Sequence, residues 1–126
     1  METADEFIER KNKKFLEDKN KPMKVKDIGR RGKINWIRED WIFMPQTNYP
    51  EKVFVVERFR RDIIEGKTAN KFGSKLGDIE YRIGYYIVGK IGNKKGKWTW
   101  GQYCLIIPKE DLDKLIKLAR EKEVIS

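Results

Sequence analysis

The stretch 79–107, IEYRIGYYIVGKIGNKKGKWTWGQYCLII, decides the fold of this chain. Apolar or aromatic residues occupy every odd position from 79 to 87, which is the two-residue period of a strand with one buried face. The glycine-bounded loop 92–96 follows, and a second extended run begins at Lys97. We therefore predict a β-hairpin whose second strand continues to Ile107.

The register of this hairpin determines which side chains share a face. Pairing Ile91 with Lys97 across the loop predicts that Val88 faces Trp100. One face then carries basic and aromatic side chains, namely Arg82, Tyr86, Lys90, Trp98 and Trp100. Two interpretations of the tryptophans remain open: their rings are exposed for stacking, or they are buried beneath the N-terminal helix or another strand.

The two ends of the chain carry helix signals. Thr3 and Glu6 form a capping-box pattern before a helix expected over about 4–19. Its apolar stripe is short and consists of Ala4, Ile8, Phe15 and Leu16. The last helix opens at Pro108, and its stripe at helical spacing is Leu112, Leu115, Ile116 and Ala119. That stripe predicts a helix packed on the sheet.

The middle of the chain is more ambiguous. Aromatic and β-branched residues over 34–44 predict a strand with a turn or bulge at Glu39 and Asp40, ended by Pro45. The Asn48 cap and Pro50 in the first turn favour a helix over about 50–65. Against this helix, the run of β-branched and aromatic residues at 53–56 prefers a strand.

These elements predict an α+β fold. The expected architecture is a single small domain with an antiparallel sheet of three to five strands, a strongly curved C-terminal hairpin, an N-terminal helix, and a C-terminal helix packed on one face. Its expected parts are a loosely attached helix over 1–20, a basic connector over 21–33, and a core over 34–126. A chain of 126 residues suffices for one such core.

The composition narrows the possible chemistry. The chain has a formal charge of +9 and no histidine, which excludes Ser-His-Asp catalysis and the usual zinc-finger ligand sets. Its single Cys104 cannot form an internal disulfide, and its apolar neighbours suggest a buried thiol. We expect no cofactor and no resident metal.

The positive charge is concentrated in the middle of the chain. Residues 21–38 hold seven basic side chains and one acidic one, and residues 79–108 hold five basic and one acidic. Segregated basic and aromatic residues are typical of a surface that meets a polyanion. We therefore predict a non-catalytic nucleic-acid-binding protein, for DNA or RNA. The predicted contacts are Arg30, Arg31, Lys33, Arg82, Tyr86, Lys90, Lys94, Lys95, Trp98 and Trp100.

Two other functions remain open. A surface rich in tryptophan also suits an accessory subunit that contacts another protein. Alternatively, the chain could be an Mg²⁺-dependent nuclease that binds its metal ion through side chains of an acidic cluster, Asp62, Glu65, Asp78 and Glu80. The sequence shows no membrane span or export signal, so we expect a cytoplasmic protein, and it leaves the oligomeric state open.

Overall fold

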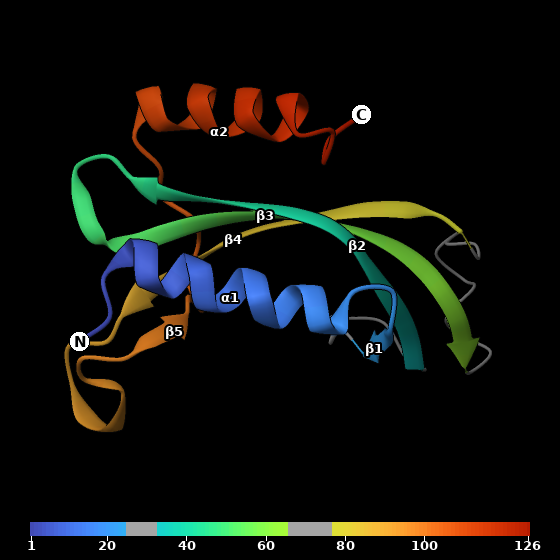
Figure 1. Cartoon of the computed structure of the whole chain (residues 1–126), viewed down its shortest axis with the longest axis horizontal. Helices are drawn as coiled ribbons and strands as arrows, with labels where there is room; N and C mark the ends of the chain where they lie inside the picture. The colour runs from blue at the N-terminus through green and yellow to red at the C-terminus, as the bar shows by residue number, and fades with distance from the viewer. Residues whose placement is uncertain (25–32, 66–76) are drawn as a thin grey trace.

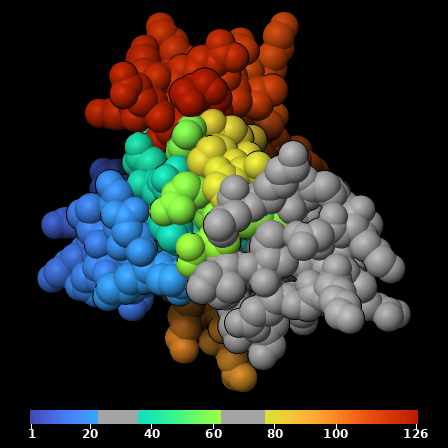
Figure 2. Space-filling view, turned by 90° about the vertical axis from the view of Figure 1, so that its right-hand side faces the viewer, coloured from blue at the N-terminus to red at the C-terminus, as the bar shows by residue number. Residues whose placement is uncertain are grey.

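The computed structural model describes residues 1–24, 33–65 and 77–126. In this part of the chain, two α-helices lie on opposite sides of an antiparallel sheet with strand order β1-β2-β3-β4-β5 (Figure 1; Figure 2). The predicted α+β fold is confirmed. In chain order the elements are α1 (Ala4–Asp18), β1 (Pro22–Lys24), β2 (Lys33–Gln46), β3 (Tyr49–Glu65), β4 (Ile79–Val88), the 3-10 turn η2 (Gly92–Lys94), β5 (Trp98–Trp100) and α2 (Lys109–Glu121).

The predicted helix over 50–65 is wrong, because this segment is strand β3 at the centre of the sheet. All four residues from Val53 to Val56 are fully buried, on both faces of the strand. A helix would bury only one stripe of them, whereas a central strand covered on both faces buries every residue. Asn48 instead belongs to the tight turn between β2 and β3, where Gln46 pairs with Tyr49.

Strand β2 has the predicted bulge. Its pairing with β3 shifts between Arg38 and Asp40, so Glu39 is the extra residue. Pro45 does not end the strand, since β2 continues through Pro45 to Gln46. This stretch of β2 has β3 as its only strand partner in the described residues, and an edge tolerates a proline that donates no hydrogen bond.

The hairpin is confirmed, but its register and length differ from the prediction. Val88 pairs with Trp98 and Tyr86 with Trp100, a shift of two residues from the predicted pairing. The loop is longer than expected because the N–H of Gly89 already bonds to the C=O of Lys97. A shift of two residues keeps every side chain on its predicted face. The second strand is only Trp98–Trp100 and does not extend to Ile107.

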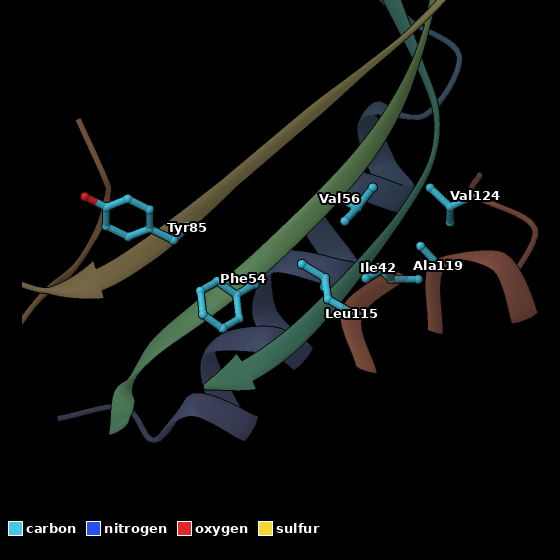
Figure 3. Close-up of a cluster of buried hydrophobic side chains, with 7 residues drawn as sticks. All are labelled: Ile42, Phe54, Val56, Tyr85, Leu115, Ala119 and Val124. Atoms are coloured by element: carbon cyan, nitrogen blue, oxygen red, sulfur yellow. The ribbon is translucent and has the colours of Figure 1, made fainter. Parts of the chain in front are cut away.

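Helix α2 covers one face of the sheet. Leu115 and Ala119 are fully buried against it, whereas Leu112 of the predicted stripe is 45% exposed. Figure 3 shows the cluster that joins the helix, the C-terminal tail and the sheet, which comprises Ile42, Phe54, Val56, Tyr85, Leu115, Ala119 and Val124. Leu105 and Ile107 pack against this cluster from the segment between β5 and α2.

Helix α1 covers the other face of the sheet, and the sheet curves around this helix (Figure 1). Its capping box between Thr3 and Glu6 is present as predicted. Phe7 and Phe15 anchor the helix, with 0% and 4% of their surface exposed, while Leu16 of the predicted stripe is exposed. Phe7 was missed by the predicted stripe. The cluster that it joins contains Phe43, Val53, Val55 and Tyr86 of the sheet.

Candidate nucleic-acid interface

A buried carboxylate organises the face of the sheet beside α1. Glu57 of β3 has no exposed surface, and Arg82 lies directly opposite it on β4. Arg82 donates from Nε to Oε2 at 2.5 Å and from Nη2 to Oε1 at 3.0 Å. Arg38 of β2 donates from Nε and Nη2 to the same Oε1, at 3.2 and 3.0 Å. Four N–H groups therefore hold one carboxylate, which satisfies it without water.

Aromatic rings enclose the two guanidinium groups. The Arg38 guanidinium carbon lies 3.7 Å from the ring centre of Phe15, so α1 forms a wall of the site. The Arg82 guanidinium carbon lies 5.1 Å from the ring centre of Phe59 and 4.8 Å from that of Trp100. These contacts fix both guanidinium planes and lower their exposure to solvent.

Positive charge exceeds negative charge at this position. Lys11 of α1 lies over the Tyr86 ring, with its Nζ 5.0 Å from the ring centre. Burial lowers the pKa of Lys11, and the nearby Arg10 and Arg38 lower it further, while Glu57 opposes them. We name Lys11, Arg38, Glu57 and Arg82 the Glu57 cluster. Its three cations surround one carboxylate, which leaves a surplus positive charge in a partly dehydrated site.

A further arginine, Arg61, lies on the same face of the sheet outside the Glu57 cluster. Arg61 lies two residues after Phe59 on β3 and therefore on the same face, and its side chain is fully buried. Its guanidinium carbon lies 5.7 Å from the ring centre of Trp36 on β2. Arginine beside an aromatic ring thus recurs along this face of the strand.

Tyr86 and Trp98 are not available for stacking on bases in this structure. Phe7 of α1 stacks on Trp98 with a ring-centre distance of 4.7 Å and lies 5.0 Å from Tyr86. The indole N–H of Trp98 donates to the carbonyl of Glu2 at 3.0 Å. Burial raises the pKa of the Tyr86 hydroxyl, and Glu57 adds to that rise. Of the two interpretations left open, burial beneath the N-terminal helix applies to Trp98, and α1 also covers Tyr86, which was predicted as a nucleic-acid contact.

Trp100 is the exposed ring of the predicted hairpin face. It is 37% exposed and meets Tyr86 edge-on at 5.1 Å. Gly84 leaves room for this ring, because a Cβ at position 84 would lie 2.3 Å from a ring carbon of Trp100. A glycine in β4 thus lets the indole pack directly against the backbone beside Arg82.

The remaining predicted contacts are basic. Lys94 and Lys95 are exposed at the tip of the hairpin. Lys90 is exposed and bonds to Glu51 at 2.6 Å, a hydrogen bond that raises the pKa of Lys90. Lys33 begins strand β2, whereas Arg30 and Arg31 lie outside the described residues.

Arg38, Glu57 and Lys11 were missed by the sequence analysis. Once 50–65 was interpreted as a helix, Glu57 had no reason to face Arg82. The signal was present, since a glutamate directly after the apolar run 53–56 is unusual in a central strand.

Within residues 1–24, 33–65 and 77–126, no group of three or more acidic, cysteine or histidine side chains could hold a metal ion. Cys104 is exposed rather than buried as expected, because the chain leaves the sheet after Trp100. Within the described ranges, the helices are too short or too polar to cross a membrane.

Comparison with family models, with curated proteins and with solved structures found no match for this chain. Functional inference therefore depends on the geometry and charge of the site itself.

Proposed function

We propose that this chain binds single-stranded nucleic acid without catalysing a reaction on it. Trp100 stacks on an unpaired base, and the surplus charge of the Glu57 cluster attracts the adjacent phosphates. The observation that carries the proposal is the exposed Trp100 ring with the Arg82 guanidinium 4.8 Å from its centre. An aromatic ring beside basic side chains is the usual way to hold an unpaired base and its phosphate.

The hairpin tip supplies further contacts in this proposal. Lys95 lies five residues before Trp100, so it is at most about 18 Å away along the chain. A nucleic-acid strand running along β5 would meet Trp100 and then the exposed Lys94 and Lys95. These lysines would position the phosphates and would not read the base sequence.

The proposal excludes Tyr86 and Trp98 from direct contact with bases. Their rings contact Phe7, so a base could reach them only if α1 left the sheet. Trp98→Ala should therefore destabilise the fold, whereas Trp100→Ala should weaken binding and leave the fold intact.

Fluorescence anisotropy with a labelled oligonucleotide of about 15 nucleotides tests the proposal. Between about 50 and 200 mM salt, affinity should fall steeply, with a slope of about −0.7 per phosphate contacted. Trp100→Ala should cost about 1–3 kcal/mol of binding free energy. Tyr103→Ala is the matched control, because Tyr103 is 86% exposed in the segment after β5. No binding, salt-independent binding, or equal losses in the two variants would each contradict the proposal.

A further inference from the structure

Among the described residues, no strand pairs with the side of β4 that faces away from β3 over residues 79–83. β5 pairs only with Tyr86, Ile87 and Val88 of this ten-residue strand. The N–H of Gly101 donates to the C=O of Tyr85 at 2.8 Å, so odd-numbered residues of β4 direct their backbone groups away from β3. The N–H and C=O groups of Ile79, Tyr81 and Ile83 therefore point away from β3. No other backbone group in the described chain bonds to them.

Large apolar side chains are exposed at this edge, as is typical of a strand that pairs with another strand. Tyr81 is 39% exposed and Ile83 is 45% exposed. Exposed edges in proteins are usually protected by charged side chains, proline or a bulge. The segment 79–83 contains no proline, its pairing with β3 is regular, and its two charged side chains, Glu80 and Arg82, have opposite signs.

The sequence of this edge is complementary to itself. Residues 79–83 read I-E-Y-R-I, a pattern that is symmetric about Tyr81 apart from its two opposite charges. A two-fold axis at Tyr81 would pair two copies antiparallel, with Ile79 opposite Ile83 of the second copy. It would also place Glu80 opposite Arg82 of the second copy, twice per dimer. Arg82 bonds to Glu57 through Nε and Nη2, so Nη1 is the group that would meet this glutamate.

We propose that two copies of this chain associate through the edges of β4. The two five-stranded sheets then form one continuous sheet. An axis perpendicular to the sheet keeps both α1 faces on the same side, so the two Glu57 clusters lie next to each other and the basic surface is doubled. The pairing rests on the edge alone and not on the proposed nucleic-acid binding. Because five residues per copy form a small interface, we infer a weak, concentration-dependent dimer.

Sedimentation velocity over about 1–200 µM protein tests this association. The wild-type chain should form dimers as concentration rises. Ile83→Lys places a charge opposite Ile79 of the second copy and should raise the dissociation constant at least about tenfold. Ile91→Lys makes the same change at a residue that is 84% exposed at the hairpin and should have no effect. A wild-type chain that stays monomeric, or an Ile83→Lys variant that still dimerises like the wild type, would overturn the proposal.

Disulfide trapping gives a second test that needs no loss of function. In a Cys104→Ser background, Tyr81→Cys should cross-link two copies rapidly, because opposed hydrogen-bonded residues have Cα atoms about 5.5 Å apart. Leu112→Cys, at a position 45% exposed on α2, is the control for random collision. Cross-linking of Tyr81→Cys no faster than that of Leu112→Cys would contradict the two-fold pairing. Oligonucleotide binding by a monomer would leave the nucleic-acid proposal standing while this one failed.

Discussion

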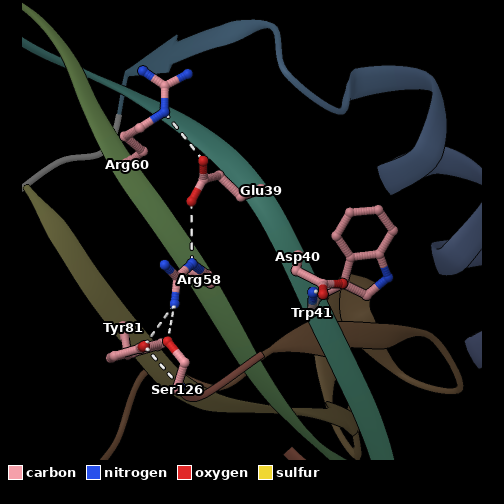
Figure 4. A network of polar contacts seen from close by, with 7 residues as sticks. All are labelled: Glu39, Asp40, Trp41, Arg58, Arg60, Tyr81 and Ser126. Carbon is pink, nitrogen blue, oxygen red and sulfur yellow. Dashed lines mark hydrogen bonds and ion pairs between the residues drawn. The ribbon is translucent and has the colours of Figure 1, made fainter. Parts of the chain in front are cut away.

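Two glutamates of the sheet each bind a pair of arginines. Glu57 is buried inside the molecule, whereas Glu39 is partly exposed at its surface. Glu57 has 0% of its side chain exposed, and its partners Arg38 and Arg82 have 6% and 33%. Glu39 is 29% exposed and binds Arg58 and Arg60, both at 3.1 Å (Figure 4). Within the described residues, Glu57 accepts hydrogen bonds from four N–H groups and Glu39 from two, so the two bridges differ in hydrogen bonding as well as in burial.

Alternation along β3 places the two bridges on opposite faces. Glu57 is odd-numbered and faces α1, while Arg58 and Arg60 are even-numbered and lie on the face of Phe54, which packs towards α2. Arg58 also donates to the Tyr81 hydroxyl at 2.9 Å and to Ser126 Oγ at 3.0 Å, which ties the C-terminus to the sheet (Figure 4). We expect burial to decide what each bridge contributes more than the number of its bonds does.

The largest effect is expected from Glu57→Gln. This change keeps the volume of the side chain but leaves two guanidinium groups in a dehydrated site without a counter-charge. We expect the free energy of unfolding to fall by about 3–5 kcal/mol. Urea unfolding followed by circular dichroism measures it. A loss below about 1 kcal/mol would mean that the buried bridge behaves like a surface pair.

Asp111 sharpens the comparison, because it is a buried carboxylate held by neutral donors. Its partner Thr47 donates to it from the backbone N–H at 2.9 Å and from the hydroxyl. Burial acts to raise the pKa of Asp111, but the two hydrogen bonds from Thr47 and the nearby charge of Lys114 together lower the pKa below its usual value. Asp111→Asn should cost about 1–2 kcal/mol at neutral pH.

The pH dependence of this contribution follows from the direction of the shift. A carboxyl with a lowered pKa in the folded state stabilises the fold above its unfolded pKa of about 3.9, and this stabilisation is lost as pH falls through the folded pKa. The stability difference between wild type and Asp111→Asn should therefore be full at pH 7 and shrink below about pH 4. A difference that stays constant with pH would show that the ionised form is not what Thr47 stabilises.

The smallest effect is expected from Glu39→Gln. The side chains of Glu39, Arg58 and Arg60 are 29%, 23% and 39% exposed, so the carboxylate of Glu39 keeps contact with water and its attraction to the arginines is screened. We expect a loss of at most about 1 kcal/mol, and a smaller one at high salt. Thermal unfolding at two salt concentrations measures it. A loss as large as that of Glu57→Gln would remove the distinction between the two bridges.

The fold was largely predictable from local patterns. Alternation identified β4, and caps and apolar stripes identified both helices, because these signals depend on nearby residues. β3 was missed since the cap-like Asn48 lies in a hairpin turn and Pro50 lies in the strand that follows it, and only the neighbouring strands show that the run 53–56 is buried on both faces. Register depends on loop geometry, which the sequence does not specify.

The candidate site was predictable only in part. Arg82 and Trp100 were found because a shift of two residues preserves the face of a strand. Their neighbours Arg38, Glu57 and Lys11 come from three other elements, so only the tertiary structure brings them together. The same tertiary contacts, through Phe7, remove Tyr86 and Trp98 from the exposed surface.

The most direct test of the proposed interface is a titration of the ¹⁵N-labelled chain with a single-stranded oligonucleotide, followed by the indole N–H signals in NMR spectra. Trp98 donates its indole N–H to Glu2 beneath α1, whereas Trp100 is 37% exposed beside Arg82. We predict that the Trp100 signal and the amides of Lys94 and Lys95 shift, while the Trp98 signal stays in place. Unchanged spectra, or a shift of Trp98 as large as that of Trp100, would contradict the account.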